Sequence, residues 1–298
     1  MSDTNAAGAT PALFDSQSLS EDTETRRAIM TQPPKLRRWY RLNRARIGRA
    51  LLGFVSIGVC LLCWHLLTVN KVDAFIRFEN VPSPSDVIAS IRKVTATSEF
   101  AEHVLVSVRR IFIGFSVAAL IAIPLGLLIG RFVMLRAALF PIVEIARPIP
   151  AIAWVPMAIM LWPTSEESIL FITFLGSFFP ILLNTLQGVE SVDPVLVRAA
   201  RSLGASESAI FIEVYLPGAL THIFSGLAIG MGVAWVSLIA AEMISGQFGI
   251  GYFTWQAYSL VDYPDIVLGM ITIGVLGLIS SWAIRAAGTF FMPWRASR

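Results

Sequence analysis

The stretch that decides the fold of this chain reads DPVLVRAARSLGA at residues 193–205. Asp193 and Pro194 are residue types that favour the start of a helix, and Gly204 is typical of a helix end. The pattern therefore predicts a short helix, a glycine stop and a second short helix, and then Pro217 opens the next apolar stretch. Its charged side chains exclude burial of this segment in lipid: Arg198, Arg201, Glu207 and Glu213.

The rest of the chain has the composition of a membrane protein. Of its 298 residues, 55% are hydrophobic and 14% are charged, and the mean hydropathy is +0.70, whereas soluble domains carry roughly 25% charged residues. A helical span needs about 20 apolar residues, and helices are the expected form because lipid cannot hydrogen-bond the backbone. We therefore expect an all-α integral membrane protein with about six spans. They are predicted at residues 48–69, 108–130, 137–161, 167–188, 218–244 and 264–288.

The distribution of charge divides the chain further. Residues 1–34 are polar and are expected to be mostly disordered, and a basic run over 26–49 is typical of anchoring beside a membrane rather than of nucleic-acid binding. The predicted organisation is an N-terminal tail (1–47), a first span with an external loop and a short surface helix from Pro84 (48–103), a five-helix core that includes the polar insert 189–217 (104–290), and a C-terminal segment (291–298).

The basic residues of the short loops predict the orientation. Arginines occupy the 131–136 turn, the insert and the C-terminus, whereas the 162–168 and 245–264 loops carry acids and no Lys or Arg. This alternation predicts that both termini are cytoplasmic. Arg109 and Arg110 depart from it, because they fall at the outer end of the second predicted span.

Several kinds of chemistry have no signal in the sequence. The chain has no phosphate-binding GxxxxGK[ST] loop, so ATP hydrolysis is expected on a separate chain. Cys60 and Cys63 lie within an apolar stretch without partner ligands, which favours small hydrophobic side chains over a metal or redox site. No HExxH, GxSxG or paired intramembrane aspartates occur. We expect no enzymatic activity, no metal site and no nucleic-acid partner.

Charged and aromatic residues within the spans are candidates for a pathway or gate. Glu144 and Arg147 stand three residues apart on one helix face, and Pro148 and Pro150 disrupt the helix directly after them. These residues either line the pathway, where Arg147 could attract an anion, or form a structural ion pair near the interface. Trp154 and Trp235 either line a cavity or belong to an interfacial belt. Glu242 either faces the cavity or anchors the outer gate, or it is an exposed interfacial carboxylate.

The small residues Gly226 and Gly230 form a GxxxG contact motif. It predicts a close helix contact, either within the chain or between two copies.

The insert resembles the cytoplasmic EAA loop of ABC importer permeases, whose pattern is Glu-Ala-Ala, three residues, Gly, and a hydrophobic stretch that ends in Leu-Pro. Ala199, Ala200, Gly204 and Leu216-Pro217 match this pattern, whereas Arg198 stands where the family usually has Glu. The resemblance implies a coupling helix that docks in a cleft of the ATPase subunit, without the salt bridge of that Glu. The coupling residues would be Val197, Arg198, Ala199, Ala200, Arg201, Leu203, Gly204 and Ala205.

The resemblance extends over most of residues 80–285, through VPSP at 81–84, RPIP at 147–150, AEM at 241–243 and GIGY at 249–252. These motifs are similar to the branch of permeases that serves nitrate, sulfonate, taurine and bicarbonate importers. The resemblance implies a type I ABC importer fold in the inner membrane, in contact with lipid. It also implies a second permease copy, ATPase subunits that hold ATP and Mg²⁺, and an extracytoplasmic solute-binding protein. This chain would bind no cofactor. The alternative is a secondary transporter driven by an ion gradient, which would favour paired acids at the midplane or an inverted repeat.

Overall fold

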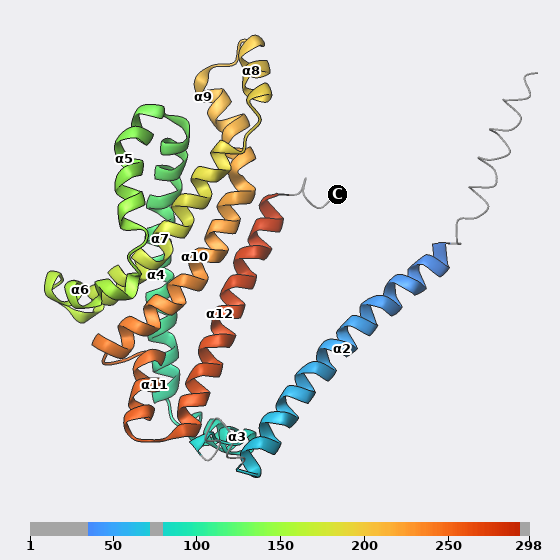
Figure 1. The fold of residues 1–298 in the computed structure, drawn as a ribbon, viewed down its shortest axis with the longest axis vertical. Helices are drawn as coiled ribbons and strands as arrows, with labels where there is room; N and C mark the ends of the chain where they lie inside the picture. The colour runs from blue at the N-terminus through green and yellow to red at the C-terminus, as the bar shows by residue number, and fades with distance from the viewer. Residues whose placement is uncertain (1–34, 72–79, 293–298) are drawn as a thin grey trace, which may run out of the picture. The chain divides into compact units, whose positions relative to one another are not determined.

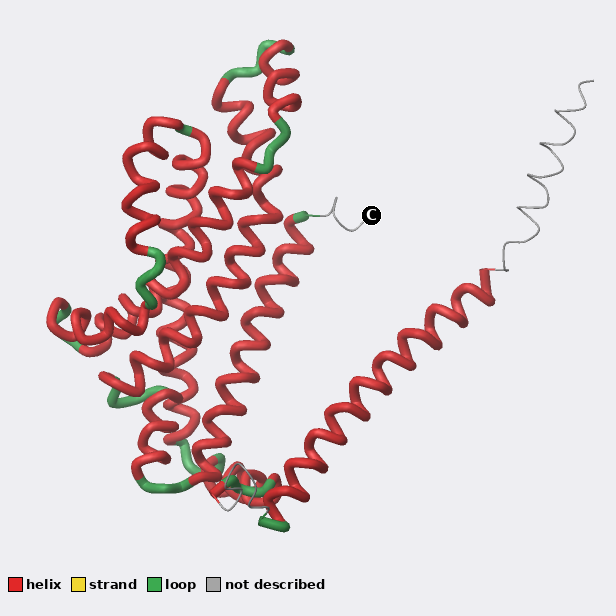
Figure 2. Tube along the Cα trace, viewed as in Figure 1, coloured by secondary structure: helices red, strands yellow, loops and turns green. Residues whose placement is uncertain are grey.

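The computed structural model describes residues 35–71 and 80–292, and residues 35–47, 49 and 50 only as helical backbone. This part of the chain consists of helices and connecting loops, without a strand (Figure 2). The chain divides into two compact units, residues 1–66 and 67–298. The all-α prediction is confirmed, and the predicted disorder of residues 1–34 concerns residues outside the described part.

The described part of the first unit is one helix, α2 (Lys35–Val69), which ends just past the unit boundary. Its apolar segment Leu51–Val69 is long enough to cross a membrane and contains the predicted first span except for its first turn. The helix begins at Lys35, within the predicted tail, so the basic run from Lys35 to Arg49 is part of the helix. Cys60 and Cys63 are free thiols exposed on the surface of α2.

The second unit begins with α3 (Pro84–Val94), the short helix predicted from Pro84. Ser83 and Asp86 form a capping box, and the hydrogen bonds from Ser83 hold the pKa of the Asp86 carboxyl below its ordinary value. The helix rests on the first turn of α12 (Tyr263–Phe291), where the Ser90 hydroxyl donates to Asp265. Polar contacts therefore fix α3 to α12.

Three long helices form the core of this unit: α4 (Glu99–Arg131), α7 (Ser165–Glu190) and α10 (Leu216–Ser245). Gly226 and Gly230 of α10 face α7, and a Cβ added at Gly226 would lie 2.7 Å from Asn184 Cβ. The GxxxG motif thus serves a seam within the chain, which answers the alternative that the sequence left open. The helix α4 begins nine residues before the predicted span, because its first turns are amphipathic rather than apolar.

The third predicted span is broken. It consists of α5 (Val133–Ala146), a 3-10 turn over Ala151–Trp154 and α6 (Val155–Leu161), and its two arms bend by 85°. Pro148 and Pro150 explain the break, because proline lacks a backbone donor and crowds the preceding turn. Within the described residues, five helices are long and apolar enough to cross a membrane, or six if the bent pair is one span. The expectation of about six spans agrees with this count, with the third span broken.

The polar insert contains α8 (Pro194–Ser202) and α9 (Glu207–Ile210). The prediction that the second short helix is separate from the next span is wrong. The helix α9 continues through a π-turn at Phe211–Tyr215 into α10. The ring of Pro217 would crowd the Glu213 carbonyl in a regular helix, and the Leu216 amide instead donates to Phe211 O. Proline therefore widens the helix at this junction rather than starting it.

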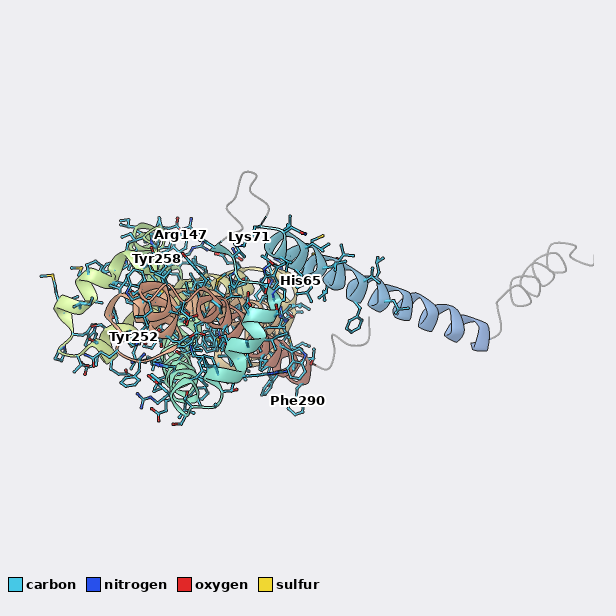
Figure 3. The ribbon with its side chains drawn as sticks, turned by 90° about the horizontal axis from the view of Figure 1, so that it is seen from below. His65, Lys71, Arg147, Tyr252, Tyr258 and Phe290 are labelled. Carbon is cyan, nitrogen blue, oxygen red and sulfur yellow. The ribbon has the colours of Figure 1, made fainter. Side chains whose placement is uncertain are left out.

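The two ends of this unit differ (Figure 1). The α8 end carries α8, α9, the turn between α4 and α5, and the last turn of α12. The α11 end carries α3 and α11 (Ile250–Ser259). Figure 3 looks onto the α11 end and labels Tyr252 and Tyr258, which both belong to α11. Two of the segments whose arginines predict a cytoplasmic position, the 131–136 turn and the insert, thus share the α8 end, whereas Arg295 and Arg298 lie outside the described residues.

The glycine seam allows a matched test. We expect Gly226→Ala to lower the free energy of unfolding by about 1–3 kcal/mol relative to Gly232→Ala, because the new methyl group overpacks the contact with α7. Gly232 lies on the same helix with nothing within 4 Å of an added Cβ, so its change to Ala reports helix propensity alone. Unfolding in mixed detergent micelles measures both, and equal stability of the two variants would contradict the seam.

Candidate functional site

The helix α8 is a well-capped element that projects from the bundle. The Asp193 carboxylate accepts a hydrogen bond from the Val195 amide at 2.8 Å. At the other end, Gly204 has φ +82, and the Ala205 amide donates to Ala200 O at 3.1 Å, which completes a Schellman motif. A left-handed residue at this position favours glycine. The predicted helix start and glycine stop are confirmed.

The predicted coupling residues all lie on α8 or its C-terminal cap, and most of them face outward. Val197 is buried. Arg198, Ala199, Arg201, Leu203 and Gly204 are exposed, and Ala200 and Ala205 are half-buried. Leu203 is 88% exposed, although it lies outside the apolar spans. Exposed apolar side chains on a polar insert indicate a surface that another protein covers.

An ion-pair cluster attaches α8 to the long helices. Glu207 accepts from Arg201 Nε of α8 at 2.8 Å and forms an ion pair with Arg131 at the end of α4. The Arg131 guanidinium also lies over the Tyr215 ring, 5.3 Å from its centroid. Glu207 therefore links Arg201 of α8 with Arg131 at the end of α4.

A second feature is a pocket of about 510 Å³ beside the broken third span. Four predicted pathway residues line it: Arg147, Pro148, Pro150 and Trp154. Residues of α7 and α10, among them Phe179 and Val233, form the rest of its wall. The structure therefore brings these four candidates together at one cavity.

The Arg147 side chain is partly paired. Its Nη1 lies 3.2 Å from Glu144 Oε1, and both side chains are more than a third exposed. Glu144 does not line the pocket itself. The predicted ion pair is present, and its cationic member faces the cavity, so the pathway and structural interpretations of this pair are compatible.

The other two candidates lie elsewhere. Trp235 is buried, and its indole N–H donates to Ser280 Oγ of α12 at 2.9 Å. Glu242 is 0% exposed. The alternative in which Glu242 is an exposed interfacial carboxylate is therefore wrong. Neither residue lines the pocket beside the broken span.

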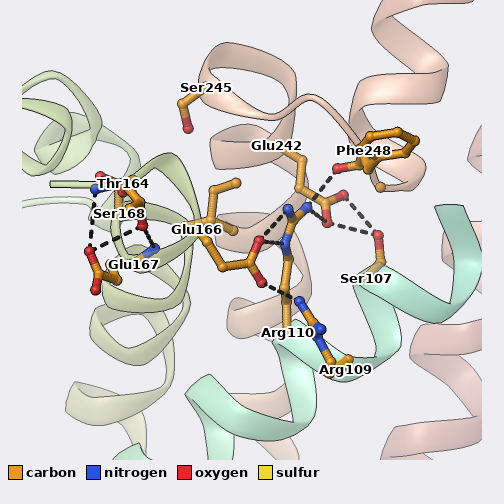
Figure 4. Close-up of polar contacts among 12 residues, drawn as sticks. Ser107, Arg109, Arg110, Thr164, Glu166, Glu167, Ser168, Glu242, Ser245 and Phe248 are labelled. Atoms are coloured by element: carbon orange, nitrogen blue, oxygen red, sulfur yellow. Dashed lines mark hydrogen bonds and ion pairs between the residues drawn. The ribbon is translucent and has the colours of Figure 1, made fainter. Parts of the chain in front are cut away.

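Glu242 is the centre of a buried polar network at the α11 end (Figure 4). Its carboxylate accepts hydrogen bonds from Ser107 Oγ at 2.8 Å and from Arg110 Nη1 at 3.0 Å. Arg110 also donates to Glu166 at 2.5 Å and to the Phe248 carbonyl at 2.6 Å. Arg110, one of the two arginines that depart from the orientation pattern, is thus neutralised by two carboxylates.

The same network caps α11. The first amides of this helix find acceptors on other helices: Gly249 N donates to His103 Nδ1 at 3.0 Å, Ile250 N to Ser107 Oγ at 2.8 Å, and Gly251 N to Glu242 Oε2 at 2.9 Å. The first turn of a helix has no internal partners for these groups. Side chains of α4 and α10 therefore fix the position of α11.

Sequence analysis did not predict this network, because its members are far apart in the chain. Arg110 and Glu166 are separated by 56 positions, and Arg110 and Glu242 by 132. A signal was present, since Arg109 and Arg110 fall at the outer end of their span, and Glu166 belongs to an acidic loop at that same side. Opposite charges on one side of a membrane protein indicate pairing.

Comparison with known proteins identifies the class. The family model described as "Binding-protein-dependent transport system inner membrane component" matches residues 122–295. The chain therefore belongs to this family, the permease subunits of ABC importers. The nitrate import permease protein of Synechocystis sp. is 33% identical, over 80% of this chain and 88% of the relative. The taurine transport system permease protein of Escherichia coli is 32% identical, over 78% of this chain and 84% of the relative.

The fold agrees with this assignment. A crystal structure of an amino acid ABC transporter with histidines matches with a TM-score of 0.51 and 17% identity, covering 67% of this chain and 96% of that chain. The expected type I importer fold is confirmed, as is the permease function. The chain is a multi-pass inner-membrane transport subunit, its ATPase is a separate chain, and its family works with a solute-binding protein. The secondary transporter is not supported.

The buried network generates a prediction. We expect Glu242→Gln to lower the free energy of unfolding by about 3 kcal/mol, because it leaves part of the Arg110 charge buried without a counter-charge. The control is Glu144→Gln, which removes the acid of an exposed pair and is expected to cost at most about 1 kcal/mol. Unfolding in mixed micelles measures both variants. A cost for Glu242→Gln no larger than that of the control would show that the network does not stabilise the fold.

Proposed function

We propose that α8 is the coupling helix through which the ATPase subunit drives this permease. The observation that carries the proposal is the rigidly capped, outward-facing helix with exposed apolar side chains, attached through Glu207 to Arg131 of α4. ATP-driven closure of two ATPase subunits would displace α8 in each of two permease copies. Two states of the pathway, with inward and outward openings, would then be stabilised differently by the ATPase.

We propose further that the transported solute is a small anion: nitrate, a taurine-like sulfonate or bicarbonate. The relatives named for nitrate and taurine support this class, and so does the position of Arg147 at the pocket. A guanidinium offers a planar fork of donors that suits oxyanions. Its pairing with Glu144 leaves the site close to neutral, which favours weak binding and release over tight capture.

The remaining parts of the proposal concern topology and partners. Both termini are cytoplasmic, with the α8 end facing the ATPase and the α11 end facing the solute-binding protein. The arginines of the α8 end and the acidic 162–168 loop support this orientation. The second permease copy is identical, lipid surrounds the pair, and ATP and Mg²⁺ are held by the ATPase, while this chain binds no cofactor.

The decisive experiment is ATP hydrolysis by the complex reconstituted in lipid with its ATPase and binding protein. We expect one solute of a panel of nitrate, taurine and bicarbonate, loaded onto the binding protein, to stimulate hydrolysis. Hydrolysis that is indifferent to the permease and to every loaded binding protein would contradict the proposed function.

The docking role of α8 predicts that Ala199→Trp abolishes binding of the ATPase, because a bulky ring on the exposed face prevents close approach of the two surfaces. Co-purification of the ATPase with the detergent-solubilised permease measures binding. The control is Ser259→Trp, which adds the same ring to an exposed position on α11 and should leave the ATPase bound. Normal binding and transport in Ala199→Trp would exclude docking through this face.

The pathway role of Arg147 predicts that Arg147→Ala lowers uptake of the stimulating anion by about tenfold, which is the loss expected for one charge-assisted hydrogen bond. The complex should still assemble, and Arg147→Lys should retain part of the uptake because it keeps the charge. Uptake into proteoliposomes measures the effect. Unchanged uptake in Arg147→Ala would leave this residue with a structural role only.

A further inference from the structure

The exposed face of α8 carries one charge that no described residue of the chain neutralises. Asp193 accepts the Val195 amide, and Arg201 is paired with Glu207. Within the described part of the chain, the Arg198 guanidinium has no ion-pair partner, and α8 itself contains no acidic residue. Arg198 is thus an exposed cation, without an ion-pair partner among the described residues, on the helix at the tip of the unit (Figure 1).

The helical geometry places this cation beside an apolar surface. Leu196, Ala199 and Leu203 are spaced three and four residues apart, so they share one face of α8. Val195 is three residues before Arg198 and lies between this apolar face and Arg198 on the helix surface. Leu196 and Leu203 are 58% and 88% exposed, while Val197 points to the opposite, buried side. The outward arc of α8 is therefore an apolar face with a positive charge at one edge, which we name the α8 docking face.

The occupant of this face must tolerate both features. An apolar partner surface alone would desolvate Arg198 without compensation, and a basic partner surface would repel it. A groove with an apolar floor and a carboxylate at the edge that meets Arg198 satisfies both. We infer that the ATPase subunit of this importer presents an Asp or Glu side chain to Arg198, an inference that rests on the proposed docking role of α8.

This pairing has a consequence for partner choice. A groove that carries a basic side chain at this edge would repel Arg198. Like charges that meet across an interface disfavour wrong pairings. The charge at position 198 is therefore a specificity determinant that selects the cognate ATPase against ATPases with a basic groove.

Binding of the purified ATPase to the detergent-solubilised permease tests the inference, with Arg198→Lys, Arg198→Gln and Arg198→Glu as the variants. We expect Lys to bind within about twofold of the native chain, Gln about threefold more weakly, and Glu about tenfold more weakly at low salt. High salt should narrow these differences, because ions screen an exposed pair. Thermal unfolding of each variant checks that the exposed substitution leaves the fold intact.

A charge exchange identifies the partner group. Each Asp and Glu of the ATPase groove is changed in turn to Lys, and binding to Arg198→Glu is measured again. Restoration of binding by one of these changes, and by no change outside the groove, confirms the pair. Failure of every groove substitution to restore binding overturns the inference.

Two further outcomes overturn the inference and separate it from the proposed function. If Arg198→Glu binds normally while Ala199→Trp does not, α8 docks without this carboxylate. If both variants bind normally, the docking role itself is wrong. A loss for Arg198→Glu that occurs only in bilayers with anionic lipid, and not in detergent, would assign Arg198 to a lipid headgroup instead.

Discussion

The pairing of Arg110 with Glu242 and Glu166 is the constraint on which the arrangement of the long helices depends. A buried guanidinium is tolerated only when carboxylates compensate it, and here the two acids come from α10 and α7 while the arginine comes from α4. The same carboxylate and its neighbour Ser107 accept the first amides of α11. The Arg110 network thus fixes the relative position of α4, α7, α10 and α11 at the α11 end. Further along the bundle, the close glycine contacts hold α7 against α10.

Features with local causes could be predicted from the sequence. The capped α8, the stop at Gly204, the start of α3 at Pro84 and the break after Arg147 all follow from residue types at neighbouring positions. The number of spans follows from apolar length in the same way. Prolines beside a charge pair are rare in an apolar stretch, so they mark the cavity residues around Pro148 in the sequence. Such signals need no knowledge of which helices touch.

Features with distant causes could not be predicted. The burial of Glu242 depends on Arg110 and Ser107, which precede it by 132 and 135 positions, and nothing in the sequence around Glu242 distinguishes it from an interfacial acid. The continuity of α9 with α10 depends on how a helix absorbs Pro217, because widening into a π-turn and starting a new helix are both compatible with a proline. Tertiary packing decides these cases, and a single sequence does not contain it explicitly.

The stiffness of the core has a mechanical consequence. The helices α4, α7 and α10 are joined by close glycine contacts and by buried ion pairs, so relative sliding among them would break several favourable interactions at once. If the ATPase displaces α8 as proposed, we expect these three helices to rotate as one rigid unit. A displacement at the α8 end would then reach the α11 end as a rotation, and its amplitude there would depend on the distance from the rotation axis rather than on any change of shape in between.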